Sequence, residues 1–120
     1  MSAPPFKHYP QARTDYKIPL LAGDNAYLGD VLSSDKTNPD KPISAGFFRL
    51  VKGEPLTYTY GYDEMKIILE GDYTITDTTG QSVVAKPGDV FMFPKGTTIT
   101  FTTSDYGLGF YVGQRKESDF

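Results

Sequence analysis

Short segments rich in β-branched and aromatic residues, each closed by a glycine, a proline or a polar turn, follow one another from Ile43 onward. They comprise residues 43–53, 56–71, 72–76, 81–85, 90–94, 97–103 and 107–114, and a similar segment spans 26–32. Regularly spaced strands of this kind favour a closed barrel or a sandwich. No stretch of helical length shows a 3.6-residue apolar period, and only the loop at 33–42 has room for a short helix. The sequence therefore predicts an all-β fold.

The 120 residues suffice for a single domain. Residues 1–25 contain several prolines and no sustained period, so we interpret them as an N-terminal arm that wraps the domain or exchanges with a partner subunit. The β domain is expected to span 26–120. An exchanged arm and an unpaired edge strand both favour a homodimer, because an exposed edge promotes aggregation.

Composition excludes several classes of protein. The chain has no cysteine, which rules out disulfides, a thiolate nucleophile and cysteine-bound zinc. Its one histidine, His8, rules out a multi-histidine metal site. A net charge of −3 without charge blocks argues against a nucleic-acid partner. No targeting signal or membrane-spanning apolar run is recognisable, so we expect a cytoplasmic protein without a membrane partner.

An unusual row of side chains follows from strict alternation along residues 58–68. If this segment is one strand, a single face carries three phenols, a carboxylate, an ammonium group and an isoleucine: Tyr58, Tyr60, Tyr62, Glu64, Lys66 and Ile68. Either a barrel interior with a ligand pocket or a polar outer face would explain such a row. The pattern alone leaves both open, since the opposite row (Met65, Ile67 and Leu69) is the more apolar.

Two glycine-punctuated segments resemble the paired motifs of the cupin superfamily, whose members are small jelly-roll β-barrels. In the first motif, Glu64 and Gly71 match the family spacing, and the two family histidines fall on Tyr58 and Tyr60. The second motif aligns glycine, proline and glycine with Gly88, Pro94 and Gly96. There the family histidine falls on Ile99 and the family asparagine on Thr103.

The stretches SAGFF, YDEMKIILEGDYTI and AKPGDVFMFPKGTTITF resemble more narrowly the EutQ branch of cupins, over roughly residues 26–113. The resemblance implies a single-domain cupin barrel. Relatives in this branch belong to ethanolamine metabolism, and phosphotransfer to acetate is attributed to the family. No phosphate-cradling glycine loop is recognisable in this chain, so that activity is the least favoured expectation.

The resemblance also bears on metal binding, because cupins that use a metal hold it with three histidines and a glutamate. Here only Glu64 remains, beside Tyr58, Tyr60 and Ile99. A phenol with a pKa of about 10 is a poor ligand near neutral pH. We therefore expect no metal and no cofactor, with a weak oxygen-only site at Glu64 and Tyr60 as the remaining route.

The side chains at the former ligand positions suit acid–base chemistry. Glu64, Tyr60, Tyr58 and Lys66 are the expected catalytic residues, acting in an isomerisation, elimination, dehydration or cyclisation. A carboxylate inside an apolar, phenol-lined cavity has a raised pKa unless a lysine or the phenols stabilise its charge. The expected substrate-binding residues are Tyr62, Arg49, Phe91, Phe93, Ile99, Phe101 and Tyr111. Strand parity leaves open whether Phe91 and Phe93 or their neighbours Val90 and Met92 face inward. The alternative function is a non-catalytic small-molecule-binding or assembly protein.

Overall fold

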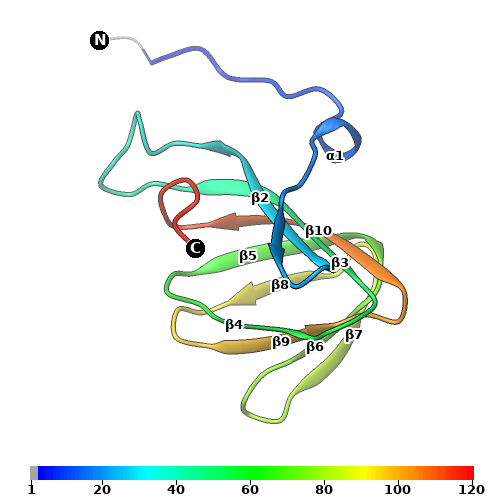
Figure 1. Cartoon of the computed structure of the whole chain (residues 1–120). Coiled ribbons are helices and arrows are strands. Elements are labelled where there is room, and N and C mark those ends of the chain that lie inside the picture. Colours follow the sequence, from blue (N-terminus) through cyan, green and yellow to red (C-terminus); the bar gives the residue numbers. More distant parts are fainter. Residues whose placement is uncertain (1–2) are drawn as a thin grey trace.

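The computed structural model describes residues 3–120 and consists of two antiparallel sheets that enclose a common core (Figure 1). The first has six strands in the order β1-β2-β3-β10-β5-β8: Leu20–Ala22, Ala26–Ser33, Ser44–Val51, Tyr106–Gly113, Glu64–Gly71 and Val90–Phe93. The second has four strands in the order β4-β9-β6-β7: Leu56–Thr59, Thr98–Thr102, Tyr73–Thr76 and Ser82–Ala85. The prediction of an all-β jelly-roll barrel is confirmed.

The core between the sheets is mainly aromatic. The Phe48 ring from β3 stacks on Tyr73 of β6 with 5.4 Å between centroids, and meets Phe101 of β9 edge-on at 5.1 Å. The Tyr73 hydroxyl donates a 2.7 Å hydrogen bond to the Phe48 carbonyl oxygen, so its polar end is satisfied. Burying a ring of this size stabilises the fold by about 1.5–3 kcal/mol. These contacts of β3 with β6 and β9 therefore hold the two sheets together.

Residues 56–71 form two strands instead of the single strand that alternation predicts. β4 ends at Thr59 and belongs to the four-stranded sheet, whereas β5 begins at Glu64 in the six-stranded sheet. Residues 60–63 cross between the sheets and are held by the turn after β8: Tyr60 N–H donates to the Thr97 carbonyl oxygen, and Lys95 N–H to Asp63 Oδ1. A barrel made of two sheets needs such crossings, because a strand that changes sheet must bend at the corner.

The chain's one described helix, α1, is a single turn at Ala12–Asp15 in the arm, so the loop at 33–42 is not where helix forms. Pro39 and Pro42 interrupt the loop, which turns at Ser34 instead. Beyond α1, strand β1 pairs with β2 and Tyr16 packs on the outer ring of Phe47, 6.4 Å between centroids. Among residues 3–120, no helix has the length and apolar character needed to cross a membrane.

Candidate active site

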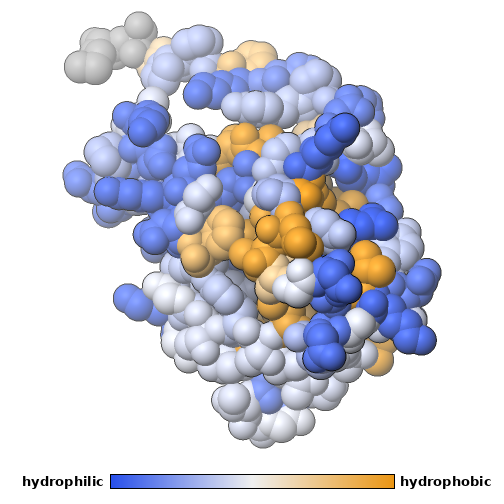
Figure 2. All heavy atoms as spheres, in the orientation of Figure 1, coloured by the Kyte–Doolittle hydropathy of each residue, from blue (hydrophilic) through white to orange (hydrophobic). Residues whose placement is uncertain are grey.

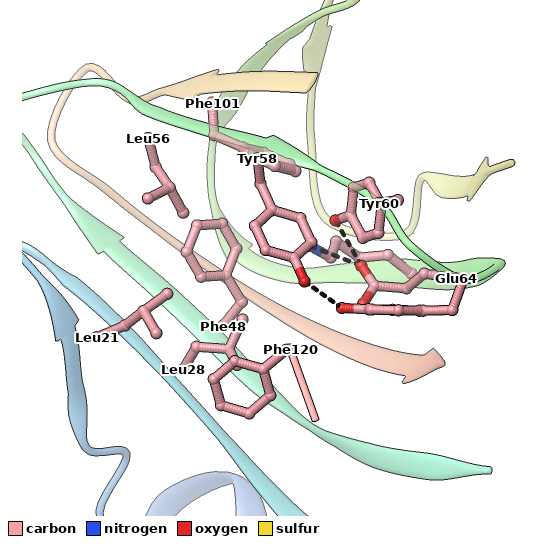
Figure 3. A pocket seen from close by; sticks show the side chains of 11 residues that line it. Leu21, Leu28, Phe48, Leu56, Tyr58, Tyr60, Glu64, Phe101 and Phe120 are labelled. Carbon is pink, nitrogen blue, oxygen red and sulfur yellow. Dashed lines mark hydrogen bonds and ion pairs between the residues drawn. The ribbon is translucent and has the colours of Figure 1, made fainter. Parts of the chain in front are cut away.

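A small cavity lies between the sheets (Figure 3). Eleven residues from both sheets, the crossing segment and the end of the chain line it: Leu21, Leu28, Phe48, Leu56, Tyr58, Tyr60, Tyr62, Glu64, Lys66, Phe101 and Phe120. The centre of a water molecule has about 20 Å³ to move in, which is room for one water. Leu21 and Phe120 are each 38% exposed. They border the surface where Figure 2 shows hydrophobic residues gathered around β1 and beside the C-terminal end.

Glu64 is the polar centre of this cavity. Its side chain is only 3% exposed, and its Oε2 accepts a 2.7 Å hydrogen bond from the Tyr60 hydroxyl. Burial first, and then the charge of Glu64, raise the pKa of Tyr60 well above that of a free phenol. Tyr60 is therefore a neutral hydrogen-bond donor at physiological pH.

Lys66 reaches the same carboxylate oxygen from the next inward position of β5. Its Nζ lies 3.5 Å from Glu64 Oε2, with the side chain 1% exposed. The Phe48 and Phe101 rings lie against each other beside Nζ, each with its centroid 4.6 Å from that atom. Burial lowers the pKa of Lys66 below that of an exposed lysine, although Glu64 acts in the opposite direction. The site thus contains an ammonium group from which burial helps to remove the proton.

Tyrosine rings form the rest of the polar wall. The Tyr58 and Tyr62 hydroxyls lie 3.2 Å apart and share a hydrogen bond (Figure 3). Tyr60 meets Tyr58 edge-on at 4.9 Å and stacks on Phe93 at 5.2 Å. Burial raises the pKa of Tyr62, so it too remains protonated. Three tyrosine hydroxyls and one carboxylate therefore converge on one side of an otherwise apolar cavity.

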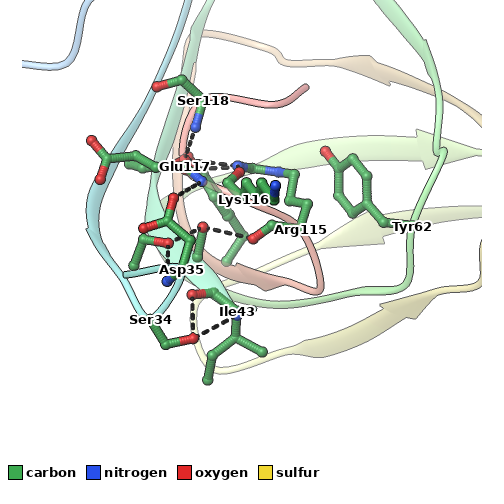
Figure 4. Close-up of polar contacts among 12 residues, drawn as sticks. Ser34, Asp35, Ile43, Tyr62, Arg115, Lys116, Glu117 and Ser118 are labelled. Carbon is green, nitrogen blue, oxygen red and sulfur yellow. Dashed lines mark hydrogen bonds and ion pairs between the residues drawn. The ribbon is translucent and has the colours of Figure 1, made fainter. Parts of the chain in front are cut away.

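Beside the cavity, a buried ion pair anchors the end of the chain (Figure 4). Arg115 contacts both carboxylate oxygens of Asp30, at 2.7 and 2.8 Å, and neither side chain is more than 3% exposed. Asp30 also accepts the Tyr111 hydroxyl at 2.6 Å and the Ser118 N–H at 2.7 Å. Although burial opposes it, hydrogen bonding to Arg115 lowers the pKa of Asp30. We call residues 114–120 the C-terminal hook; its Phe120 ring lies over the Arg115 guanidinium at 4.9 Å.

A comparison of the sequence with models of protein families agrees with this fold. The family model described as "Ethanolamine utilisation protein EutQ" matches residues 22–116. The chain belongs to the EutQ family. A curated EutQ from Escherichia coli (strain K12), named an acetate kinase, is 40% identical over 85 residues, or 71% of this chain. The chain spans 34% of that EutQ protein's length.

Solved structures show the same cupin barrel. The structure of an ethanolamine utilization protein Q from Salmonella typhimurium LT2 is 28% identical, with a TM-score of 0.64 over 77% of this chain and 71% of its own. The polyketide cyclase RemF from Streptomyces resistomycificus reaches a TM-score of 0.74 over 94% of this chain and 82% of its own. RemF is only 14% identical, so its likeness to this EutQ-family chain is one of fold.

The structure brings most of the expected site residues of this EutQ-family protein together. Tyr58, Tyr60, Tyr62, Glu64, Lys66 and Phe101 line the cavity. Phe93 lies directly behind it, stacked on Tyr60 and 5.5 Å from Lys66 Nζ. The register of β5 and β8 pairs Glu64 with Phe93 and Lys66 with Phe91, so these phenylalanines share the inward face. Val90 and Met92 are 71% and 55% exposed, so these two side chains face outward. The sequence pattern had left open which pair faces inward.

Four expected substrate-binding residues lie elsewhere. Phe91 and Ile99 line a separate hollow against β6 and β7. Tyr111 is fully buried, and its hydroxyl is occupied by Asp30. Arg49 alternates with the inward Phe48 and Leu50, so it points outward, 4.9 Å from the Tyr106 ring. The expectation that Arg49 meets a substrate in this cavity is therefore wrong.

Sequence reasoning missed five apolar residues of the cavity and the ion pair beside it. The apolar residues are Leu21, Leu28, Phe48, Leu56 and Phe120. Phe48 had a usable signal, because alternation along β3 places it on the same face as Leu50. No sequence signal indicated that Phe120 lines the cavity. No signal indicated the pairing of Asp30 with Arg115 either, since these two residues are 85 positions apart in the chain.

The cupin metal site does not fit the residues present. The family ligand positions hold two phenols, an isoleucine and Glu64, and the Lys66 ammonium 3.5 Å from Glu64 would repel a cation. Within residues 3–120, no group of three or more histidine, cysteine, aspartate or glutamate side chains is placed to hold an ion.

Proposed function

We propose that this EutQ-family cupin is a metal-independent enzyme that moves protons on a small organic molecule held in the aromatic cavity. The observation that carries the proposal is the convergence of Tyr60 and Lys66 on one buried oxygen of Glu64. A carboxylate enclosed by apolar rings and supplied with hydroxyl donors suits general acid–base catalysis. Isomerisation, elimination or dehydration, and cyclisation are the reaction classes that need only such groups.

Each polar group has a role in this proposal. Glu64 removes a proton from a carbon next to a carbonyl group and returns it at the neighbouring position or to a leaving group. The Tyr58 and Tyr62 hydroxyl pair donates a hydrogen bond to the oxygen on which negative charge develops, while Tyr60 keeps its hydroxyl on Glu64 and holds the carboxylate in place. Lys66 stabilises the carboxylate between turnovers. Leu28, Leu56 and the phenylalanine rings exclude water from the reacting atoms.

The relatives support this proposal only in outline. RemF is a polyketide cyclase on the same barrel, which shows that the fold can host a reaction of one of these classes. The acetate kinase activity in the name of the Escherichia coli EutQ belongs to a protein of which this chain spans 34%. We therefore do not carry phosphotransfer over to this chain.

A non-catalytic small-molecule-binding or assembly protein is the second candidate. The size of the cavity favours the assembly role within this alternative, because the cavity holds one water as the chain now lies and leaves no room for a substrate. In that case Glu64, Tyr60 and Lys66 stabilise one another inside the barrel and catalyse nothing.

The test is proton exchange at carbon. The protein is incubated in D₂O with neutral carbonyl and phenolic compounds, and deuterium incorporation is followed by proton NMR. Glu64→Gln should keep the fold and lower the exchange rate by roughly 10²-fold or more. Glu54→Gln, at an exposed position outside the cavity, is the matched control and should exchange at the wild-type rate.

Two results would count against the enzyme. Exchange that persists unchanged in Glu64→Gln would remove Glu64 from the chemistry. Compounds that bind to the wild-type protein, seen as shifted tyrosine resonances, yet show neither exchange nor conversion would support the binding protein instead.

A further inference from the structure

We propose that Lys66 is an amine nucleophile that forms an imine with a small neutral aldehyde or ketone in the cavity. This inference rests on the proposed function of the same site and names its substrate class. Lys66 differs in exposure from the other lysines of the chain. The chain has nine, and the other eight are all exposed, whereas Lys66 is 3% exposed and lines the cavity.

The surroundings of Lys66 Nζ are those of a nucleophile. Among residues 3–120, its one charged partner is Glu64, at 3.5 Å. The rings of Phe48, Phe101 and Phe93, which contact one another, form an apolar wall beside Nζ with centroids 4.6, 4.6 and 5.5 Å away. Amines in apolar pockets lose their proton more readily than exposed amines, and the neutral amine is the reactive form.

The same contacts supply the proton transfers that imine formation needs. Glu64 takes a proton from the Lys66 ammonium, and the neutral Nζ then attacks the carbonyl carbon. A C–N bond forms as the π electrons of the C=O bond move to oxygen, which is protonated by transfer from nitrogen. The resulting carbinolamine receives the proton held by Glu64 on its hydroxyl, loses water and becomes the iminium ion. The positive charge of Lys66 is thereby conserved, and one water is released.

Tyr60 assists without changing this balance. Its hydroxyl already donates to Glu64 Oε2, the oxygen nearest Nζ, and so holds the carboxylate where the proton is exchanged. Once formed, the iminium ion acidifies the neighbouring C–H bond, because its positive nitrogen accepts the electron pair. Glu64 then removes that proton, which joins the imine to the acid–base chemistry proposed above.

The cavity also restricts the carbonyl compound. Its lining is mostly apolar, and its one anionic group is Glu64, so a neutral carbonyl compound is favoured over a carboxylate-bearing one. The space holds one water, so a larger ligand must displace a side chain. Phe120 is the lining residue that lies beyond the last strand, in the C-terminal hook, and we expect its ring to move.

Reductive trapping tests the proposal on the unmodified protein. The wild-type chain is incubated with propanal and sodium cyanoborohydride near pH 6.5, digested, and analysed by peptide mass spectrometry for N-propyl-lysine. We expect Lys66 to be labelled roughly tenfold or more faster than the mean of the eight exposed lysines, because burial favours the neutral, reactive form of its amine. Denaturation in urea should abolish the preference.

The outcomes separate this proposal from the previous one. Labelling of the exposed lysines with Lys66 unlabelled overturns the imine, whereas Glu64-dependent exchange of deuterium would leave the acid–base function standing. Selective labelling of Lys66 without any exchange supports the imine and counts against acid–base turnover. Lys66→Arg retains the positive charge but cannot form an imine, so it should remove the fast-labelled site and leave labelling of the surface unchanged.

Discussion

One carboxylate oxygen organises the residues of the cavity. Glu64 Oε2 accepts the Tyr60 hydroxyl at 2.7 Å and lies 3.5 Å from Lys66 Nζ. A buried charge is tolerated only where it is paired and hydrogen-bonded, so each of these contacts compensates for the removal of Glu64 from water. The neighbouring contact between Tyr58 and Tyr62 is different in kind, because it joins two hydroxyls and involves no carboxylate. Similar phenols in one cavity are therefore expected to contribute unequally to stability.

Replacing Tyr60 with phenylalanine tests this inequality. Tyr60→Phe removes a hydrogen bond to a buried charged group and should lower the free energy of unfolding by about 1.5–3 kcal/mol. Tyr58→Phe, the matched control, removes a hydrogen bond between two hydroxyls and should lower the free energy of unfolding by about 0.5–1.5 kcal/mol. Urea unfolding followed by circular dichroism measures both values. An equal or larger loss in Tyr58→Phe would contradict the role given to Glu64.

Between elements, the Asp30–Arg115 pair joins strand β2 to the C-terminal hook and supports one wall of the cavity. Asp30→Asn removes one charge of this buried pair and leaves Arg115 uncompensated, which should lower the free energy of unfolding by about 3–5 kcal/mol. Arg13→Ala breaks the exposed pair with Glu70, at 3.7 Å, and should change stability by less than about 1 kcal/mol. Losses of similar size in the two variants would show that the buried pair does not anchor the hook.

The same pair predicts how stability depends on pH. The pKa of Asp30 is lower in the folded chain than the value of about 3.9 in an unfolded one. Its contribution is therefore complete above about pH 4 and is lost as the pH falls through the folded pKa. Urea unfolding between neutral and acidic pH should show a shallower acid loss in Asp30→Asn than in the wild type. Parallel curves would contradict this assignment, since Asp72 and Asp77, whose pKa values are also lowered, are present in both proteins.

At the scale of the whole molecule, the first part of the N-terminal arm lies outside the barrel and does not contribute to its core. Residues 3–10 are exposed, with Phe6 92% exposed, and Figure 1 shows this segment running outside the sheets. On the outer face, β5 and the edge strand β8 expose four further apolar side chains: Met65, Ile67, Val90 and Met92. An open edge beside an apolar face is a liability for a monomer, which favours the homodimer expected from the sequence.

Deleting the arm tests the homodimer. Without residues 1–16, a dimer that exchanges its arms should become a monomer, and the mass measured by light scattering should fall by about half. If the exposed Phe6 ring contributes to arm exchange, Phe6→Ala without the deletion should also lower the measured mass, but by less than the deletion does. A mass that the deletion leaves unchanged would contradict arm exchange.

Local patterns in the sequence were enough to determine most of the strands and turns and the common direction of Tyr58, Tyr60, Tyr62, Glu64 and Lys66. Alternation is a property of consecutive residues, and it persists even though the chain crosses between sheets at 60–63. The spacing of glycines and prolines likewise indicated a cupin barrel, because turns depend on a few adjacent residues. Neither pattern specified on which side of the wall the row of polar side chains lies.

Tertiary structure decided the rest, because the deciding contacts join distant parts of the chain. Pairing of β5 with β8 turned Phe91 and Phe93 inward, and the position of β3 turned Arg49 away from the cavity. Asp30 meets Arg115 across 85 positions, which brings Phe120 to the cavity. Such contacts arise when sheets close on each other, and no local propensity encodes them. The sequence alone thus specified the chemical groups, and folding specified which of them share one enclosed space.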